Sequence, residues 1–263
     1  MFRSESFCKF VKACDLVLVD SDAMMTMFKA TFAEHSEKVK VHRSPGVDTA
    51  EFPPRSPVLS RRALRLPEGR TTLVHVSGFQ PHHDFKAMLD ATKILEEAGT
   101  KVLLILIGHG PRWNEIKALT RKALSGDSVM MPGFVELEHI PSYLSAADIC
   151  LNLVQAETLK EGNFRATKLF EYMACARPVI ASVRPDRPVP PWATDTLLLV
   201  PPESPARIAE AVTTILAEPE EWELRCAAGR EWVVRECSWE AVSRTTLSYL
   251  HSLVAEHNRD NRR

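Results

Sequence analysis

Short apolar runs alternate with helix-period segments through the middle of the chain. Continuous apolar runs predict buried strands at residues 72–76, 102–107, 129–131, 149–154, 178–182 and 196–200. Between them, apolar residues recur at helical spacing, as at Phe85, Met88 and Leu95, and predict covering helices. Such alternation is typical of a parallel sheet covered on both faces. The pattern predicts an α/β fold, a doubly wound, Rossmann-like domain over residues 56–238.

The flanks of this domain follow a shorter pattern. The elements expected there are strands at 15–20 and 38–42, a helix opened by Ser21 and Asp22, a turn-rich linker at 44–57 and a last helix from Trp239 to about residue 256. Residues 1–55 hold less than a full domain together with the linker, and residues 239–263 form a C-terminal helix and tail. The sequence therefore predicts one complete domain between two partial segments.

Composition narrows the class of partner. The chain of 263 residues has a formal net charge of −1, so we expect no nucleic-acid partner and at most peripheral membrane contact. The longest apolar runs, such as 102–107, are too short to cross a bilayer, and charges interrupt the N-terminal apolar residues, unlike a signal peptide. The basic end NRDNRR (258–263) is interpreted as a solvated tail, with weak surface attraction as the alternative.

Cysteine usage indicates the compartment. None of the six cysteines forms a C-x-x-C pair, and several lie within apolar runs. This usage is typical of reduced, buried thiols rather than of disulfides or zinc ligands. We therefore expect a cytoplasmic protein, at most peripheral at the inner membrane face. No ligand cluster accompanies the adjacent His82 and His83, so no metal is expected.

The segments that follow the predicted strands are the candidate ligand-binding loops, because open parallel sheets bind ligands outside the carboxyl ends of their strands. The candidates in these loops are Gly78, Phe79, His83, Gly108, Gly110, Phe134 and Val135. Glycines at such points let the backbone approach a ligand closely. Neither a G-x-G-x-x-G nor a Walker A motif is present, so the loops carry no dinucleotide or P-loop signature.

Lys168 stands in the predicted first turn of a helix, where the positive end of the helix dipole disfavours a cation. A phosphate bound at this end would explain the lysine, since cation and dipole would then share one anion. Thr167 is the expected N-cap, and Glu171 lies one turn deeper, where its carboxylate could accept two sugar hydroxyls. The alternative is a surface Lys–Glu pair at i,i+3, worth a few tenths of a kcal/mol.

A family resemblance bears on these alternatives. KLFEYMACARPVIAS (168–182) resembles the donor-site helix and following strand of glycosyltransferase family 4, the group 1 glycosyl transferases with the GT-B fold. Further segments resemble the family's donor domain in the same order: SGFQPHHDFKAMLDA (77–91), LLILIGHGPRWNEIKAL (103–119) and MPGFVELEHIPSYLSAADICLNLV (131–154). DLVLVDSDAM (15–24), SPGVDTAEF (44–52) and CSWEAVSRTTLSYL (237–250) resemble the end of its N-terminal domain, its linker and its crossing helix.

The resemblance implies a hexosyltransferase that uses a nucleotide diphosphate sugar, linked to UDP, GDP or ADP, without a metal or other cofactor. It implies that Glu171 holds the ribose hydroxyls and that Lys168 holds the diphosphate with the backbone before it, at Phe164, Ala166 and Thr167. By the same resemblance, His83 occupies the position where many members of the family place a cation that faces the phosphates. The base would lie near Phe134 and Val135, and the product would belong to glycan or polysaccharide synthesis.

Four departures from the family pattern matter. Where the family's E-x7-E pattern has its first glutamate, this chain has Asn163. Asn163 is counted with Lys168 and Glu171 among the catalytic candidates. At two positions where the family usually has glycine, this chain has Asp84 and Ala176. We expect Asp84 to cap the next helix. The fourth is length, since most of the acceptor-binding N-terminal domain is absent. The expected partner is a separate acceptor-domain polypeptide or a second copy, and the alternative function is a nucleotide-sugar-binding subunit inactive alone.

Overall fold

The computed structural model describes residues 5–20, 22–42, 46–161, 166–186 and 188–260. The chain forms two compact units. The smaller comprises residues 1–47 and 234–263, and the larger comprises residues 48–233. No helix in the described ranges is both long and apolar enough to cross a membrane.

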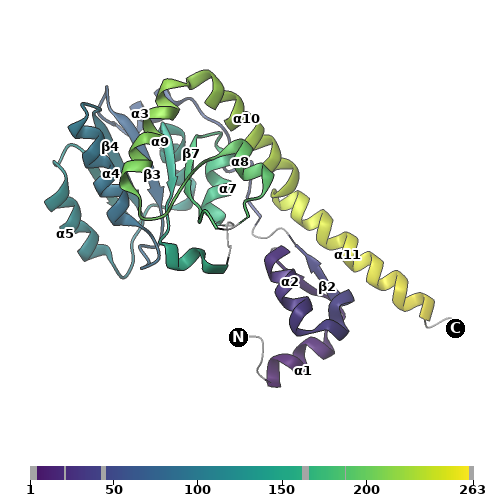
Figure 1. Cartoon of the computed structure of the whole chain (residues 1–263). Helices are drawn as coiled ribbons and strands as arrows, with labels where there is room; N and C mark the ends of the chain where they lie inside the picture. The colour runs from purple at the N-terminus through teal and green to yellow at the C-terminus, as the bar shows by residue number, and fades with distance from the viewer. Residues whose placement is uncertain (1–4, 21, 43–45, 162–165, 187, 261–263) are drawn as a thin grey trace. The chain divides into compact units, whose positions relative to one another are not determined.

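The larger unit is built on a six-stranded parallel sheet with the order β5-β4-β3-β6-β7-β8 (Figure 1). The strands are β3 (Thr71–Val76), β4 (Val102–Ile107), β5 (Val129–Gly133), β6 (Ile149–Asn152), β7 (Val179–Ser182) and β8 (Leu198–Val200). Each coincides with a predicted apolar run, which confirms the doubly wound fold. At β8 the predicted start was wrong: Thr196 ends a helix, and its hydroxyl donates to the Trp192 carbonyl (2.7 Å).

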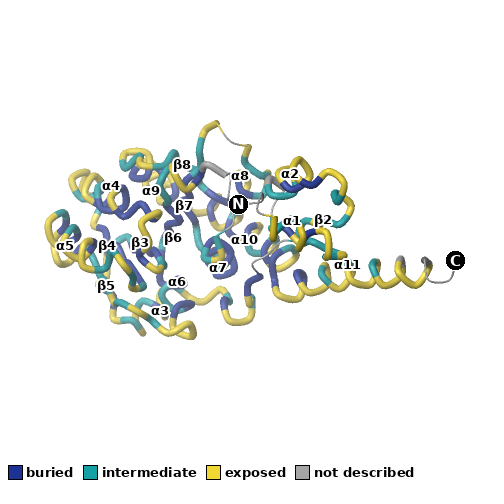
Figure 2. Tube along the Cα trace, turned by 90° about the horizontal axis from the view of Figure 1, so that it is seen from below, coloured by how far each residue is buried: buried dark blue, intermediate teal, exposed yellow. Residues whose placement is uncertain are grey.

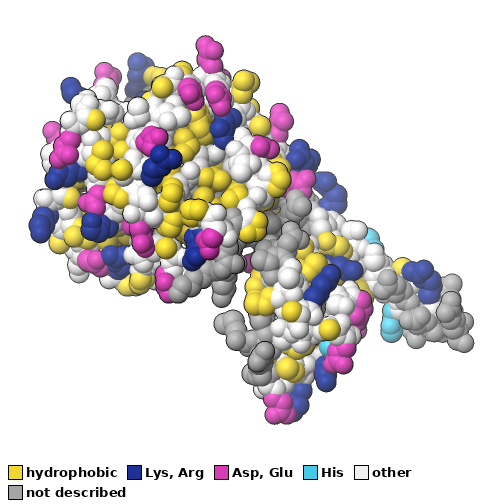
Figure 3. Space-filling model, in the orientation of Figure 1, with side chains coloured by type: hydrophobic (Ala, Val, Ile, Leu, Met, Phe, Trp, Pro, Cys, Tyr) yellow, Lys and Arg dark blue, Asp and Glu magenta, His cyan; other side chains and the backbone are white. Residues whose placement is uncertain are grey.

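Helices cover both faces of this sheet, with the buried strands between them (Figure 2). They are α3 (Pro57–Ala63), α4 (Phe85–Glu97), α5 (Trp113–Ala123), α6 (Ile140–Ala146), α7 (Thr167–Ala174), α8 (Pro191–Thr196), α9 (Pro205–Ala217) and α10 (Pro219–Glu236), with 3-10 turns at Leu137–His139 and Ala156–Glu161. Acidic and basic side chains are interspersed on the face in Figure 3, in keeping with the near-zero net charge.

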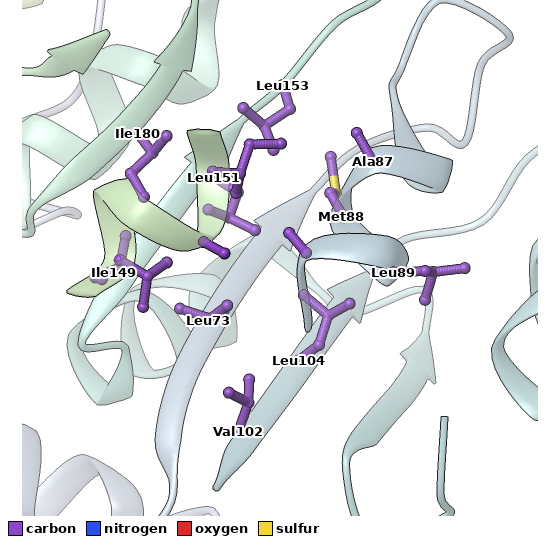
Figure 4. Close-up of a cluster of buried hydrophobic side chains, with 14 of the residues drawn as sticks. Leu73, Ala87, Met88, Leu89, Val102, Leu104, Ile149, Leu151, Leu153 and Ile180 are labelled. Atoms are coloured by element: carbon purple, nitrogen blue, oxygen red, sulfur yellow. The ribbon is translucent and has the colours of Figure 1, made fainter. Parts of the chain in front are cut away.

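The core beside α4 explains why these runs form strands. Leu73, Leu104 and Leu151 come from three neighbouring strands and are at most 1% exposed (Figure 4). Met88 of α4 packs in the same cluster. Burial of each such side chain stabilises the fold by about 1.5–3 kcal/mol. Asp84 caps α4, because its carboxylate accepts the Ala87 N–H (3.0 Å), which confirms the predicted cap.

The smaller unit contains the flanking elements. They are α1 (Glu5–Ala13), β1 (Val17–Val19), α2 (Asp22–Thr31), a 3-10 helix (Ala33–Lys38), β2 (Val39–Val41) and α11 (Trp239–Asp260). Strands β1 and β2 pair in parallel, and the Tyr249 hydroxyl of α11 donates to the Val41 carbonyl (3.0 Å). All six cysteines of the chain are free thiols, but Cys8 and Cys14 are only half-buried, which corrects the prediction for these two.

Ala176 stores strain at the end of α7. Its φ is +51°, a left-handed conformation that disfavours any side chain beyond hydrogen. The Ala176 N–H donates to the Met173 carbonyl and the Arg177 N–H to the Tyr172 carbonyl, at 2.9 and 3.2 Å, as in a Schellman motif. The motif fixes the turn into β7, so the backbone cannot relax elsewhere.

Ala176→Gly is therefore expected to stabilise the protein by about 0.5–1 kcal/mol, as measured by urea unfolding. The matched control is Ala98→Gly at the C-cap of α4, where φ is −81° and glycine brings no relief. A loss of stability in Ala176→Gly as large as that in the control would contradict the strain argument.

Candidate functional site

A cavity of about 480 Å³ opens at the carboxyl ends of β3, β6 and β7 and at the start of α7. It brings together six of the sequence candidates: Gly78, His83, Ala166, Thr167, Lys168 and Glu171. Asn163 and Phe164 lie outside the described residues. The carboxyl edge of the parallel sheet thus forms a concave site from segments that lie as far apart in the sequence as Val76 and Ser182.

The start of α7 differs from the prediction. Ala166, not Thr167, is the N-cap, because its carbonyl accepts the Leu169 N–H (2.9 Å) and the helix already includes Thr167. In the described part of the chain, no side chain caps this end. The N-terminus of α7 therefore presents backbone N–H groups and a positive dipole end at the cavity. Such an end favours an anion.

Lys168 directs its ammonium into the same region. Its Nζ lies 3.4 Å from both ring nitrogens of His83. Burial lowers the pKa of Lys168 to about 7, and the Glu171 carboxylate only partly offsets this effect. Burial also raises the pKa of Glu171. A strongly anionic group bound beside Lys168 would raise this pKa again and restore the charged form of the lysine.

The histidines around Lys168 are neutral at pH 7. The pKa of His83 falls to about 3 through burial first, then through Lys168 and His82. Behind it, His75 is fully buried and its Nδ1 lies 2.9 Å from the Leu151 carbonyl oxygen. His83 is therefore no standing cation in this structure, and the positive charge comes from Lys168 and the end of α7.

Asp84 does not compete with a bound anion for the positive charge of Lys168 and the start of α7. Its carboxylate is buried and accepts the Glu203 N–H (3.1 Å) in addition to capping α4. The Glu203 carboxylate in turn accepts the Ala156 N–H (3.3 Å). The loops after β3, β6 and β8 are thus linked by these hydrogen bonds, a role for Glu203 that its sequence surroundings did not indicate.

Gly108 and Gly110 do not line the cavity; they pack against the backbone of the loop after β3, which does. A Cβ on Gly108 would overlap the Ser77 carbonyl, and one on Gly110 would overlap the Gly78 carbonyl. The two loops therefore pack backbone against backbone. Phe79 is buried between them at a positive φ of +45°. The glycines are required for close packing of the loops, whether or not a ligand is present.

Phe134 and Val135 also lie outside the cavity lining. Phe134 is 71% exposed at the end of β5, and Val135 is half-buried. Sequence reasoning in turn missed Asn152 and Ser182, which line the cavity at the ends of β6 and β7. The available signal was one polar residue in each apolar run, within 149–154 for Asn152 and at the end of 178–182 for Ser182. Among the described residues, no group of three His, Cys, Asp or Glu side chains could hold a metal.

Comparison of the sequence with family models identifies the family of the chain. The family described as "Glycosyl transferases group 1" matches residues 70–218, which include the sheet and the cavity. The chain belongs to this family.

Curated proteins of related sequence include glycosyltransferases. The chain is 26% identical over 211 residues to a Mycobacterium tuberculosis "GDP-mannose-dependent alpha-(1-6)-phosphatidylinositol monomannoside mannosyltransferase", covering 78% of this chain and 54% of the relative. The chain spans about half the length of the curated relatives it matches.

Two solved structures share the fold. Sucrose-phosphate synthase from Thermosynechococcus elongatus has a TM-score of 0.74 at 23% identity, covering 94% of this chain and 60% of that chain. Anabaena HepE, solved in complex with UDP-glucose, has a TM-score of 0.72 at 18% identity, covering 91% and 64%. These likenesses confirm the predicted Rossmann-like fold class of the GT-B type.

Proposed function

We propose that the cavity binds a nucleotide diphosphate sugar and that the protein transfers its hexosyl group to an acceptor in glycan or polysaccharide synthesis, as a family 4 glycosyltransferase. The observation that carries this proposal is the Lys168 ammonium beside the uncapped start of α7, within one cavity. The ammonium and the helix start both favour an anion, and a diphosphate would be that anion.

Each group has a role in this proposal. Lys168 and the first N–H groups of α7 bind the diphosphate, and they offset the charge that develops on it as the sugar leaves. The Glu171 carboxylate accepts hydrogen bonds from the vicinal ribose hydroxyls. His83 lies against Lys168, and its neutral ring can donate one N–H to a phosphate; it becomes a cation only if the bound anion raises its pKa. The transfer needs no metal in this scheme, because the helix end and Lys168 supply the positive charge.

The comparisons support this class of donor. The mycobacterial relative is described as GDP-mannose-dependent, and the Anabaena structure contains UDP-glucose. We propose UDP, GDP or ADP as the nucleotide and a cytoplasmic location, with at most peripheral contact at the inner membrane face. A separate acceptor-domain polypeptide or a second copy of the chain would complete the acceptor site.

A second function is a nucleotide-sugar-binding subunit, inactive without a separate acceptor-binding chain. The cavity accounts for binding of the nucleotide sugar, which this alternative shares with the first proposal. The two proposals differ in one readout. A subunit binds the nucleotide sugar but releases no nucleotide from it in the presence of acceptors.

Calorimetric titration of the chain with UDP, GDP and ADP tests both proposals. We expect micromolar binding of one nucleotide, and Glu171→Gln is expected to weaken it about tenfold, because an amide accepts fewer hydroxyl hydrogen bonds than a carboxylate. The control is Glu97→Gln, an exposed residue of α4 paired with Lys93. Absence of binding of all three nucleotides by the folded chain would overturn the proposed function.

A further inference from the structure

Asn152 is a buried polar residue in the cavity whose hydrogen bonding the fold leaves incomplete. It ends β6, is 8% exposed and lines the cavity beside Lys168 and Glu171. Its Oδ1 is enclosed and has no hydrogen-bond partner within the described part of the chain. Of the described residues with such an atom, Asn152 is the one that lines this cavity.

Its neighbour in the sheet shows the contrast. Ser182, at the end of β7, also lines the cavity, but its hydroxyl accepts the Val154 N–H (3.2 Å) and so holds the loop after β6. Within the described residues, the Asn152 Oδ1 makes no such hydrogen bond. An unpaired buried amide costs folding free energy, whereas an apolar side chain of the same shape would not. Such a residue is expected where a ligand supplies the missing partner.

The chemistry of the amide restricts that ligand. A carboxamide donates through its NH₂ group and accepts through its carbonyl, so it pairs fully with a group that does both. A hydroxyl does both, whereas an ionised diphosphate only accepts. The diphosphate also has better partners in Lys168 and the start of α7. A sugar hydroxyl is therefore the matching group.

We propose that the Asn152 amide binds a hydroxyl of the donor sugar and thereby contributes to recognition of the sugar rather than of the nucleotide. This inference rests on the proposed function. It gives the donor sugar a described protein partner, while Glu171 is assigned to the ribose. It also distinguishes two polar side chains in the same cavity, of which Asn152 binds the ligand and Ser182 holds a loop.

The test is a calorimetric comparison of nucleotides with and without the sugar. UDP, UDP-glucose, GDP and GDP-mannose are titrated into the wild-type chain, Asn152→Leu and Asn152→Ala. The control is Asn114→Leu, an exposed asparagine of α5 outside the cavity. For the nucleotide that binds, we expect Asn152→Leu to weaken the sugar-linked form at least tenfold and to change the free diphosphate less than twofold. The melting temperature of Asn152→Leu should be unchanged or higher, because the unpaired amide is gone.

The outcomes separate the two proposals. Equal weakening of UDP and UDP-glucose, or of GDP and GDP-mannose, would overturn the inference, since the amide would then contact the nucleotide. Unchanged affinity for both forms would also overturn it. A folded wild-type chain that binds none of the four, and does not bind ADP either, would overturn the proposed function itself. If Asn152→Leu unfolds, Asn152→Ala provides the same comparison.

Discussion

Lys168→Met is expected to weaken binding of the nucleotide diphosphate at least 100-fold, or about 2.7 kcal/mol. The substitution keeps the length of the side chain and removes the ammonium that faces the cavity beside His83. Hydrogen bonds to charged groups in a buried site are worth about 1.5–3 kcal/mol, and the loss of the charge adds to this. Titration calorimetry measures the change directly.

The same lysine gives binding a specific pH dependence. Since the pKa of free Lys168 is about 7, its charged fraction falls tenfold per pH unit above that value. The bound diphosphate requires the charged form, so wild-type affinity should fall by up to about tenfold per pH unit between pH 7.5 and 9. Lys168→Met should show no such slope. The heat of binding should also depend on the buffer, because binding takes up a proton.

Stability should respond in the opposite direction. The folded pKa of Lys168 lies below the ordinary 10.5, so the unfolded chain binds more protons between these two values. This group therefore makes the wild-type protein more stable as pH rises from 7 towards 10, and Lys168→Met should lack that increment and melt higher at pH 7. The control is Lys86→Met, an exposed lysine paired with Asp90. Equal nucleotide affinity in the wild type and Lys168→Met would contradict the assigned role.

Gly110→Ala is expected to destabilise the larger unit by about 3 kcal/mol and to abolish nucleotide binding. The added methyl would overlap the Gly78 carbonyl oxygen, which belongs to the backbone and cannot rotate away. The loop after β3 would therefore shift, and Gly78 and His83 in the cavity would shift with it. Urea unfolding measures the first effect and calorimetry the second.

Two other glycines isolate the cause. Gly126→Ala meets nothing within 4 Å and has an ordinary φ, so stability should change by less than about 0.5 kcal/mol. Gly69→Ala also meets nothing but has a φ of +70°, so it should cost about 1 kcal/mol through backbone strain alone. If Gly110→Ala cost no more than Gly69→Ala, the close packing of the two loops would not be the reason for glycine at 110.

The sheet was predictable because its cause is local. Strands buried on both faces carry continuous apolar runs, and the register of β3 with β4 pairs two such runs residue for residue. Errors arose where tertiary contacts decide the boundary. Thr196 closes α8 instead of opening β8, and Ala166 replaces Thr167 as the cap of α7. In both cases the side chain was compatible with either role, so propensity could not choose.

The candidate site was predictable only in part. The spacing of Lys168 and Glu171 is visible in the sequence. The polar residues after the apolar runs indicated which segments lie at the carboxyl edge of the sheet. Asn152 carried too little signal, because one asparagine within an apolar run is ordinary. Gly108 and Gly110 were assigned to a ligand, but the carbonyls of the neighbouring loop lie where their side chains would be. No sequence pattern reveals which two loops will pack together.

By itself, the sequence determined the α/β class, the strand positions and the lysine at the start of a helix, because hydrophobic periodicity and helix position are properties of neighbouring residues. Tertiary structure alone decided the electrostatics of the site. Burial makes His83 neutral and brings the pKa of Lys168 to about 7, and it leaves the Asn152 Oδ1 without a partner among the residues that the structure describes. Desolvation depends on what the whole chain packs around a group, and that is settled only when distant strands and loops come together.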